Sequence, residues 1–541
     1  MSWLAGLPVL VLGLGDSGLA MARWCVRHGA QVRVWDSRET PPGQAALQAD
    51  LPGTPLVTGT LDVALLHSVQ LVLKSPGLSP RDERIAPLLQ EARAIGIAVQ
   101  GELDLFVRAL ADLKAAQGYT PQLLAITGTN GKTTTTAMTA LLVDRAGKRV
   151  ATAGNIGPTL LDTLSARLDD LPEVWVLELS SFQLEGGGTG VRGFEPSAAV
   201  VLNISEDHLD WHGTMAAYTA AKARVYGTGK RTGNGGGQDD GSATLALINR
   251  DDPRVEALAS SLVSAPAPET LSAKGKTKPK LVSRPVLRFG LDAPRQPGDF
   301  GLIEENGMAW LVRALPLEEP SRRRRADDEA LHLQRLMPAD ALRVRGRHNA
   351  ANALAALALA SAIGCGLAPM LHALRDYAGE PHRVQFIARL PLLLSPAGGE
   401  AEAFDDSKGT NVGATVAALH GLGADKRPGK LVVILGGDGK GQDFQPLAAP
   451  LQQHARAVAT IGRDAPLIEA ALAAAGLHGL PVQRCATLPE AVAWCFEQAR
   501  GGDAVLLSPA CASLDMFRNY VHRAEVFVGA VQALAADRGQ V

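Results

Sequence analysis

The chain has 541 residues, with 53 basic and 55 acidic side chains and a formal net charge of −2. This length exceeds what one hydrophobic core supports, so we expect about three domains. The near-neutral charge gives no support for a nucleic-acid or membrane-surface partner. Five widely spaced cysteines without a Cys-x-x-Cys pair argue against a zinc ribbon or a disulfide framework. No run of 18 apolar residues predicts a membrane span, and the apolar start lacks a basic signal-peptide region, so we expect a cytoplasmic protein.

The N-terminal region alternates between strand and helix patterns. Residues 8–13 (PVLVLG) and 31–36 (QVRVWD) predict strands, and the apolar stretch 18–28 predicts a helix that ends at Gly29. This alternation predicts a mostly parallel sheet covered by helices.

The turn after the first strand has the spacing of a nucleotide-binding loop. Residues 13–18 read GLGDSG, and Asp36 ends the next strand, as in a dinucleotide fingerprint. Alone this pattern favours NAD, but the glycines require only a tight turn and a close phosphate or packing contact. Residues 75–77 (SPG), after the strand candidate 71–74, add a turn at the same sheet edge.

The stretch 123–136 reads LLAITGTNGKTTTT, a strand followed by a glycine loop and a helix. Its glycines let backbone N–H groups face an anion, and the following helix adds its dipole. Lys132 can reach the outer phosphates, and the Thr133 hydroxyl can ligate Mg²⁺. The loop is a shorter G-x-x-G-K-T than the usual phosphate-binding pattern, and the alternative is an ordinary Gly/Thr-rich turn.

Further acids and a histidine follow the strands that come after this loop. Glu178 lies in VWVLEL (174–179), where a second Mg²⁺ ligand is expected beside a phosphate loop. Asp207, His208 and Asp210 follow AAVVLNI (198–204) and favour metal or phosphate binding. Lys222 lies in an Ala-rich helix, where a surface lysine is the alternative.

The C-terminal part repeats the pattern of a strand followed by polar residues. Strands are predicted at 430–438, 457–462 and 504–510, with helical stretches between them. Arg, Lys, Ser and Thr side chains at such strand ends suit the binding of carboxylates and phosphates. The polar groups occupy residues 347–352, 381–383, 405–411, 436–440 and 508–515.

These patterns predict an α/β protein of three domains: a Rossmann-like domain (1–118), a central P-loop ATPase-like domain (119–379) and a second Rossmann-like domain (380–541). The stretches 227–241, 265–284 and 318–329 are of low complexity or dominated by charged and small residues, so we expect solvated loops there. The arginine run in the last of them is an alternative anion site.

Ten motifs occur in an order that resembles the Mur ligases, and the resemblance covers nearly the whole chain. They are TGTNGKTT, GNIG, ELSSFQLE, EDHLD, AAK, HNAANALAA, PHR, DDSKGTN, GGDGKGQDF and SPACASLDMF.

The resemblance implies that the N-terminal sheet binds the UDP of a substrate rather than NAD. The expected contacts are Leu14, Gly15, Asp16, Ser17, Gly18, Asp36, Ser37, Arg38, Ser75 and Gly77.

The resemblance also implies ATP and two Mg²⁺ ions in the central domain. The expected nucleotide contacts are Gly128, Thr129, Asn130, Gly131, Lys132, Thr133, Thr134, Asn349, Asn352, Arg383, Asp406 and Lys408. The expected metal ligands are Thr133, Glu178, His208 and Lys222, the lysine as a carbamate. The expected catalytic residues are Lys132, Lys222, His208, Arg383 and Asn155, of which Asn155 and His208 also lie near the reacting groups of the substrate.

For the incoming amino acid, the resemblance implies contacts from Thr410, Lys440, Ser513 and Tyr520. Tyr520 replaces a phenylalanine of the best-known members, the segment from His208 to Lys222 is one residue shorter than in some, and the chain is longer than a typical member.

The implied reaction joins D-glutamate to the L-alanine carboxylate of UDP-N-acetylmuramoyl-L-alanine, through an acyl phosphate, in peptidoglycan precursor synthesis. The partners would be these small molecules, with no nucleic acid or membrane, and we expect a monomer. Three alternatives are an NAD oxidoreductase, a nucleotide-dependent switch, and another ATP-dependent amide ligase such as a folylpolyglutamate synthase.

Overall fold

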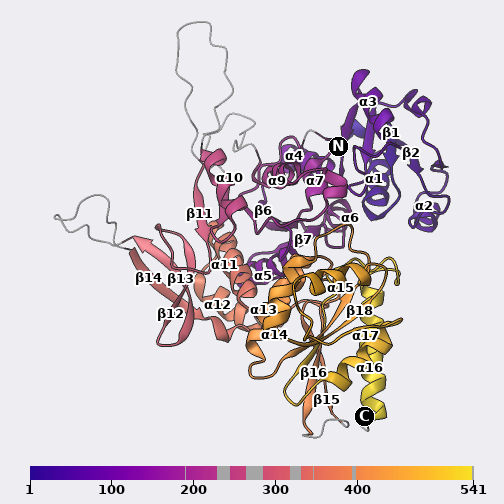
Figure 1. The fold of residues 1–541 in the computed structure, drawn as a ribbon. Coiled ribbons are helices and arrows are strands. Elements are labelled where there is room, and N and C mark those ends of the chain that lie inside the picture. Colours follow the sequence, from indigo (N-terminus) through magenta and orange to yellow (C-terminus); the bar gives the residue numbers. More distant parts are fainter. Residues whose placement is uncertain are drawn as a thin grey trace, which may run out of the picture. The chain divides into compact units, whose positions relative to one another are not determined.

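The computed structural model describes residues 1–188, 190–227, 244–263, 284–316, 331–344, 346–392 and 398–538. Strands and helices alternate along the chain, which confirms the α/β class (Figure 1). The chain forms two compact units. The first comprises Met1–Ile204, His208–Met337 and Ala353–Leu374, and the second Ser205–Asp207, Pro338–Asn352 and Arg375–Val541. Residues 228–241, 265–283 and 318–329, where we expected solvated loops, lie outside the described residues.

The first sheet is parallel throughout and has the strand order β3-β2-β1-β4-β5. Its strands are β1 (Pro8–Leu12), β2 (Gln31–Asp36), β3 (Leu56–Thr58), β4 (Leu71–Lys74) and β5 (Ala98–Gln100). The helices of this region are η1 (Ser2–Leu4), α1 (Asp16–Arg27), α2 (Gln44–Asp50), η2 (Val63–Leu66), α3 (Ala86–Ala94) and α4 (Glu102–Gln117).

The predicted strand, helix and strand at the N-terminus are therefore confirmed as β1, α1 and β2. The strand order reverses at β1, because the chain adds β2 and β3 on one side of it and β4 and β5 on the other. Ligands of such sheets bind at the carboxyl end of the strands where the order reverses. The residues 13–18 leave β1 at this point.

The second sheet has nine strands in the order β14-β13-β12-β11-β10-β9-β6-β8-β7. Its strands are β6 (Gln122–Thr127), β7 (Val150–Gly154), β8 (Val174–Glu178), β9 (Ala198–Val201), β10 (Leu245–Asn249), β11 (Val286–Phe289), β12 (Phe300–Glu305), β13 (Met308–Pro316) and β14 (Leu331–Pro338). The helices are α5 (Lys132–Arg145), α6 (Leu160–Ala166), α7 (Ser181–Glu185), α8 (Leu209–His212), α9 (Met215–Ala223), η3 (Arg224–Tyr226), α10 (Pro253–Val263), η4 (Ala339–Ala341), α11 (Arg347–Ala362) and α12 (Leu367–Asp376).

The strands from β7 to β12 are parallel, and β13 pairs antiparallel with β12. The predicted strands at 174–179 and 198–204 are confirmed as β8 and β9. Strand β6 has β8 and β9 as neighbours, so residues that follow these three strands gather at one sheet edge.

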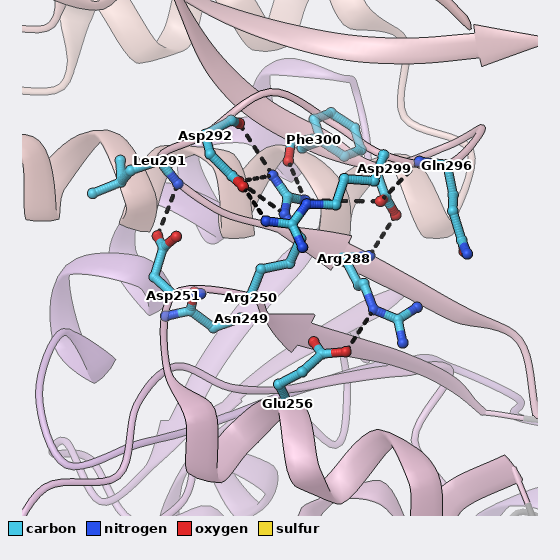
Figure 2. Close-up of polar contacts among 11 residues, drawn as sticks. Asn249, Arg250, Asp251, Glu256, Arg288, Leu291, Asp292, Gln296, Asp299 and Phe300 are labelled. Atoms are coloured by element: carbon cyan, nitrogen blue, oxygen red, sulfur yellow. Dashed lines mark hydrogen bonds and ion pairs between the residues drawn. The ribbon is translucent and has the colours of Figure 1, made fainter. Parts of the chain in front are cut away.

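A buried arginine joins the strands β10 to β12 (Figure 2). The guanidinium of Arg250 donates to Asp292 Oδ1 from Nε (2.9 Å) and Nη2 (2.6 Å), and to the carbonyl of Phe300 (3.1 Å). Its side chain is 3% exposed, and buried Asp299 lies 3.8 Å away. Arg250 therefore holds the loop after β11 against the start of β12.

The third sheet has the order β15-β16-β20-β17-β18-β19. Its strands are β15 (Gln385–Pro391), β16 (Glu400–Asp405), β17 (Leu431–Gly436), β18 (Ala455–Ile461), β19 (Val482–Arg484) and β20 (Ala504–Leu507). The helices are α13 (Val412–Asp425), η5 (Gln445–Leu447), α14 (Ala448–His454), α15 (Ala465–Ala474), α16 (Leu488–Gln498) and α17 (Tyr520–Asp537).

All pairs of this sheet are parallel except β15 with β16. The strands predicted at 430–438, 457–462 and 504–510 are confirmed. Alternate residues of β17 enter two separate cores: Val432 and Ile434 one, Val433 and Leu435 the other. The sheet is therefore covered on both faces, as a parallel sheet requires. Across the described part of the chain, no helix combines the length and the apolar character that a membrane span requires.

Candidate active site

The loop between β6 and α5 has the backbone that an anion site requires. Gly128 (φ +157°) and Gly131 (φ +83°) adopt conformations that L side chains rarely adopt. A Cβ on Gly128 would lie 2.9 Å from Cβ of Leu202. Helix α5 begins at Lys132, directly after the loop, so the positive end of its dipole faces the same space.

Two lysines meet at this loop. Lys132 Nζ donates to the carbonyls of Gly128 and Thr129 (2.8 Å each), and Lys222 Nζ donates to the same Gly128 carbonyl (2.8 Å). Lys222 is 2% exposed, so the interpretation of it as a surface lysine is wrong. Its Nζ lies 4.5 Å from the ring centroid of Tyr218. Two ammonium groups at one carbonyl favour an anion beside them.

Glu178, at the end of β8, is 1% exposed and has one oxygen available for a ligand. Its Oε1 accepts a hydrogen bond from Asn155 Nδ2 (2.9 Å), while the buried Oε2 has no hydrogen-bond partner. The backbone N–H of Asn155 donates to the carbonyl of Glu178 (2.7 Å). The two residues therefore form one pair at the ends of β7 and β8.

Two residues that we did not predict, Asn203 and Tyr218, contact the same loop, and the ring centroid of His208 lies 6.2 Å from that of Tyr218. Asn203 accepts from the Asn130 N–H (2.8 Å) and donates to the Asn130 carbonyl (3.0 Å). Tyr218 places its hydroxyl 3.1 Å from Thr129 Oγ1. His208 has φ +54°, and its ring centroid lies 4.7 Å from that of Phe182. Asn203 lies in the predicted strand 198–204 and Tyr218 lies between the motifs EDHLD and AAK, and no rule of spacing singles out either residue.

Two further predicted nucleotide contacts, Thr133 and Thr134, follow the loop directly. Thr133 and Thr134 are buried in the first turn of α5.

The loop after β1 needs its glycines for packing. Gly13 has φ +88°, and a Cβ on Gly18 would lie 1.8 Å from the Gly13 carbonyl oxygen. The Ser75 hydroxyl donates to that carbonyl (2.9 Å). We expected Gly18 to lie near a diphosphate. The close approach to the Gly13 carbonyl already excludes a side chain at position 18, whether or not a diphosphate binds there. At Gly15, by contrast, a Cβ would meet nothing within 4 Å.

Asp36 is saturated by hydrogen bonds from the protein. Its Oδ2 accepts from the Leu14 N–H (2.7 Å) and from Arg38 Nη2 (2.8 Å), and its Oδ1 from the N–H (2.9 Å) and Nε (2.8 Å) of Arg38. Burial alone would raise its pKa, but the bonds from Arg38 and Leu14 lower it to about 2. Asp36 therefore orients Leu14 and Arg38 as an ionised group.

The other predicted UDP contacts share this edge of the sheet. Asp16 and Ser17 form the first turn of α1, Leu14 is fully buried, Ser37 and exposed Arg38 follow β2, and Gly77 follows β4.

In the second unit, three loops meet at the carboxyl ends of β16, β20 and β17. Backbone hydrogen bonds run from Ala510 N–H to the Gly409 carbonyl (3.1 Å) and between Asp438 and Ala512 in both directions (3.0 and 2.8 Å). The expected amino-acid contacts Thr410, Lys440 and Ser513 are thereby placed on adjoining loops.

Arg383 lies near two other predicted or motif residues of this unit. Burial, then the charge of Arg383, lowers the pKa of His348 to about 4. Burial raises the pKa of Asp406 to about 7, against the charge of Arg383 and a hydrogen bond from Ser508 (2.7 Å). Asn352 Nδ2 donates to Asn349 Oδ1 (3.2 Å), so these two expected nucleotide contacts are hydrogen-bonded to each other.

Tyr520, the residue that departs from the family pattern, begins α17. Its ring centroid lies 6.1 Å from that of His382 and 5.7 Å from Lys408 Nζ. Tyr520 therefore keeps an aromatic ring at this position, with Lys408 over its face.

Three models of Mur ligase domains match the chain: the MurD-like N-terminal domain at residues 8–101, the middle domain at 126–281 and the glutamate ligase domain at 388–511. UDP-N-acetylmuramoylalanine--D-glutamate ligase of Albidiferax ferrireducens is 57% identical over 549 residues, covering 100% of this chain and 98% of that protein. The protein of the same name from Ralstonia nicotianae is 53% identical and covers 99% of both chains.

A solved structure shows the same fold. MurF ligase from Thermotoga maritima, in complex with ADP, matches with a TM-score of 0.54 at 15% identity, over 99% of this chain and 97% of that one. Because the identities to the curated relatives extend over the full length, the chain belongs to the Mur ligase family.

Proposed function

We propose that this protein joins D-glutamate to the L-alanine carboxylate of UDP-N-acetylmuramoyl-L-alanine at the expense of ATP, in peptidoglycan precursor synthesis. The names of the full-length relatives support this substrate pair. We further propose that it acts as a cytoplasmic monomer on these small molecules.

The observation that carries the proposal is the meeting of Lys132 and Lys222 at the Gly128 carbonyl, beside the start of α5. A phosphate chain at the helix N-terminus would receive backbone N–H groups and positive charge together. This arrangement supports ATP as the nucleotide, with Gly128 to Thr134 as its phosphate contacts.

The residues fit a divalent cation in one respect. Oε2 of Glu178 is buried without a hydrogen-bond partner, which is costly unless a cation or a donor binds it. We propose Glu178, Thr133, His208 and carbamylated Lys222 as ligands of two Mg²⁺ ions. Within the described ranges, no three His, Cys, Asp or Glu side chains gather as a metal cluster, so threonine and the lysine carbamate would have to complete the set. Bound Mg²⁺ would offset the negative charge of the phosphates.

The positively charged side chains of the site would reduce the repulsion between the ATP phosphates and the substrate carboxylate. Lys132 would hold the outer phosphate oxygens while a carboxylate oxygen attacks the terminal phosphorus, which leaves ADP and an acyl phosphate. The D-glutamate amine would then attack the carbonyl, and phosphate would leave. Asn155 and His208 are proposed to lie near these groups. The roles of Arg383, Asp406 and Lys408 toward the nucleotide remain predictions.

Phosphate release from ATP tests the proposal. Each muramyl precursor is crossed against D-glutamate, L-glutamate, L-alanine and diaminopimelate. We expect turnover only with UDP-N-acetylmuramoyl-L-alanine and D-glutamate together. Turnover that requires another pair would contradict the substrate assignment, and reduction of NAD would favour the oxidoreductase alternative.

A further inference from the structure

A cation that no predicted role uses lies beneath the loops of the second unit. Arg523, on helix α17, is 0% exposed. Its Nη1 donates to the Cys511 carbonyl (3.1 Å) and its Nη2 to the Ser407 carbonyl (2.8 Å). Its Nε is buried and makes no hydrogen bond. The carboxylates of Asp515, Asp405 and Asp406 act on it only through space.

The two carbonyls belong to different loops. Ser407 lies in the loop after β16, which carries Thr410, and Cys511 lies in the loop after β20, which carries Ser513. Arg523 reaches both from a third element, α17, so one side chain sets the spacing between them. A planar guanidinium has a fixed fork that suits two acceptors at once, whereas a lysine ammonium is a single point.

Burial of this cation has a cost that packing alone does not explain. Burial lowers the pKa of Arg523 to about 10, and nearby Cys511 and Asp515 oppose the shift. An apolar side chain of similar volume would fill the space without that cost. The retained guanidinium therefore points to a task that requires its donors or its charge.

We propose that Arg523 is a positioning residue for the amino-acid substrate. It fixes the distance between the Thr410 and Ser513 loops and places positive charge behind them, without touching the substrate itself. This inference rests on the proposed function and on Thr410 and Ser513 as the expected contacts of the incoming amino acid.

Arg523→Gln and Arg523→Lys test the inference in steady-state kinetics. We expect Arg523→Gln to raise the KM for D-glutamate by about tenfold or more, because one carbonyl link and the charge are lost. Arg523→Lys keeps the charge and one hydrogen bond to a carbonyl. Its KM for D-glutamate should therefore lie between those of the wild type and Arg523→Gln. The Kd of ATP, measured by calorimetry, should rise clearly less than the KM for D-glutamate in both variants, although the Ser407 loop also carries the expected nucleotide contacts Asp406 and Lys408.

Arg538→Gln is the matched control. Arg538 lies at the end of the same helix and also donates to a backbone carbonyl, that of Pro391 (2.7 Å), away from both loops. We expect its KM for D-glutamate to equal that of the wild type.

An unchanged KM for D-glutamate in folded Arg523→Gln would overturn the inference, as would an equal loss of ATP and D-glutamate affinity. If thermal unfolding shows that Arg523→Gln does not fold, the same two measurements on Arg523→Lys test the inference: the KM for D-glutamate and the Kd of ATP. Failure of the proposed function is visible separately, as a wild type without D-glutamate-stimulated phosphate release.

Discussion

At the scale of single residues, the structure separates side chains that bind from side chains that hold other groups in place. Lys132 and Lys222 turn their ammonium groups toward one carbonyl, and Glu178 keeps an oxygen without a partner. Asp36, by contrast, uses both oxygens within the protein. Glu178 is therefore the better candidate for direct ligand contact, and Asp36 orients its neighbours.

Replacement of Lys222 tests whether the site requires an anion or a cation. We expect Lys222→Ala to lose on the order of 100-fold in kcat, because it removes the carbamate that we propose beside Mg²⁺. Bicarbonate should not restore activity, but a short carboxylic acid should restore part of it by filling the vacated space. The measurement is kcat with and without added acetate.

Lys222→Arg is the control, because it keeps a positive charge but does not form the carbamate. We expect it to be as inactive as Lys222→Ala. Full activity of Lys222→Arg would refute the carbamate and leave Glu178 and His208 to hold the metals without it.

At the scale of elements, the turn from β1 to α1 shows two glycines with different tasks. Gly18 is required by contact with Gly13, whereas Gly15 is the N-cap of α1 and faces open space. An added methyl group at these two positions should therefore affect different properties.

We expect Gly15→Ala to keep the fold, since its φ of −91° suits alanine, and to raise the KM for the UDP substrate by crowding the diphosphate. Its KM for ATP should not change. Gly18→Ala should instead lower the free energy of unfolding by about 1–3 kcal/mol through overpacking. Kinetics and urea unfolding of the two variants check this, and equal losses for both nucleotides in Gly15→Ala would argue against a dedicated UDP site.

The contacts of buried Arg250 between β10 and β12 offer a second test at this scale. Arg250→Met leaves buried Asp299 and the Phe300 carbonyl without their arginine, so we expect a loss of about 3 kcal/mol in the free energy of unfolding.

Arg295→Met is the control, because Arg295 binds the same Asp292 from an exposed position (2.6 Å). Its loss should stay below about 1 kcal/mol. Similar losses of unfolding free energy in both variants would show that the burial of Arg250 is not what stabilises the contacts between β10 and β12.

At the scale of the whole molecule, a buried acid links stability to pH. Burial raises the pKa of Glu102 to about 7, although the Leu161 N–H donates to it (3.0 Å) and the Ser17 and Thr159 hydroxyls lie near. The nearby charge of Asp162, which is paired with Arg23, acts in the same direction as burial.

The unfolded chain therefore loses this proton at a lower pH than the folded chain does. The stability that protonated Glu102 contributes is fully present below the unfolded pKa and is lost as the pH rises to about 7. Between pH 5 and pH 7, we expect the unfolding free energy of the wild type to fall relative to that of Glu102→Gln. Above pH 7 the difference between the two proteins should level off. Urea unfolding across this range checks it, and a difference that is constant with pH would contradict the raised pKa.

Much of this architecture could be predicted from the sequence, because buried parallel strands are continuous apolar stretches and glycine loops follow them. Strands β1, β2, β8, β9, β17, β18 and β20 and the start of α5 were predicted on that basis. Strands β12 to β14 were not, because their buried and exposed residues do not alternate cleanly.

Three features of the site depend on contacts between distant residues. Local sequence did not show that Lys222 reaches Gly128, that the Leu14 N–H donates to Asp36, or that Arg523 is buried. Charged residues are usually exposed, so their burial becomes visible only in the folded chain. The predicted domain boundaries at 118 and 379 remain predictions.

The most direct test of the proposed ligation follows one oxygen atom. UDP-N-acetylmuramoyl-L-alanine labelled with ¹⁸O in its alanine carboxylate is incubated with ATP, Mg²⁺ and D-glutamate, and the released phosphate is analysed by mass spectrometry. If the carboxylate attacks the terminal phosphorus and the amine then displaces phosphate, each phosphate carries one oxygen from the carboxylate. We therefore predict labelled phosphate in step with formation of the amide product. Unlabelled phosphate, with its new oxygen taken from water, would contradict the account.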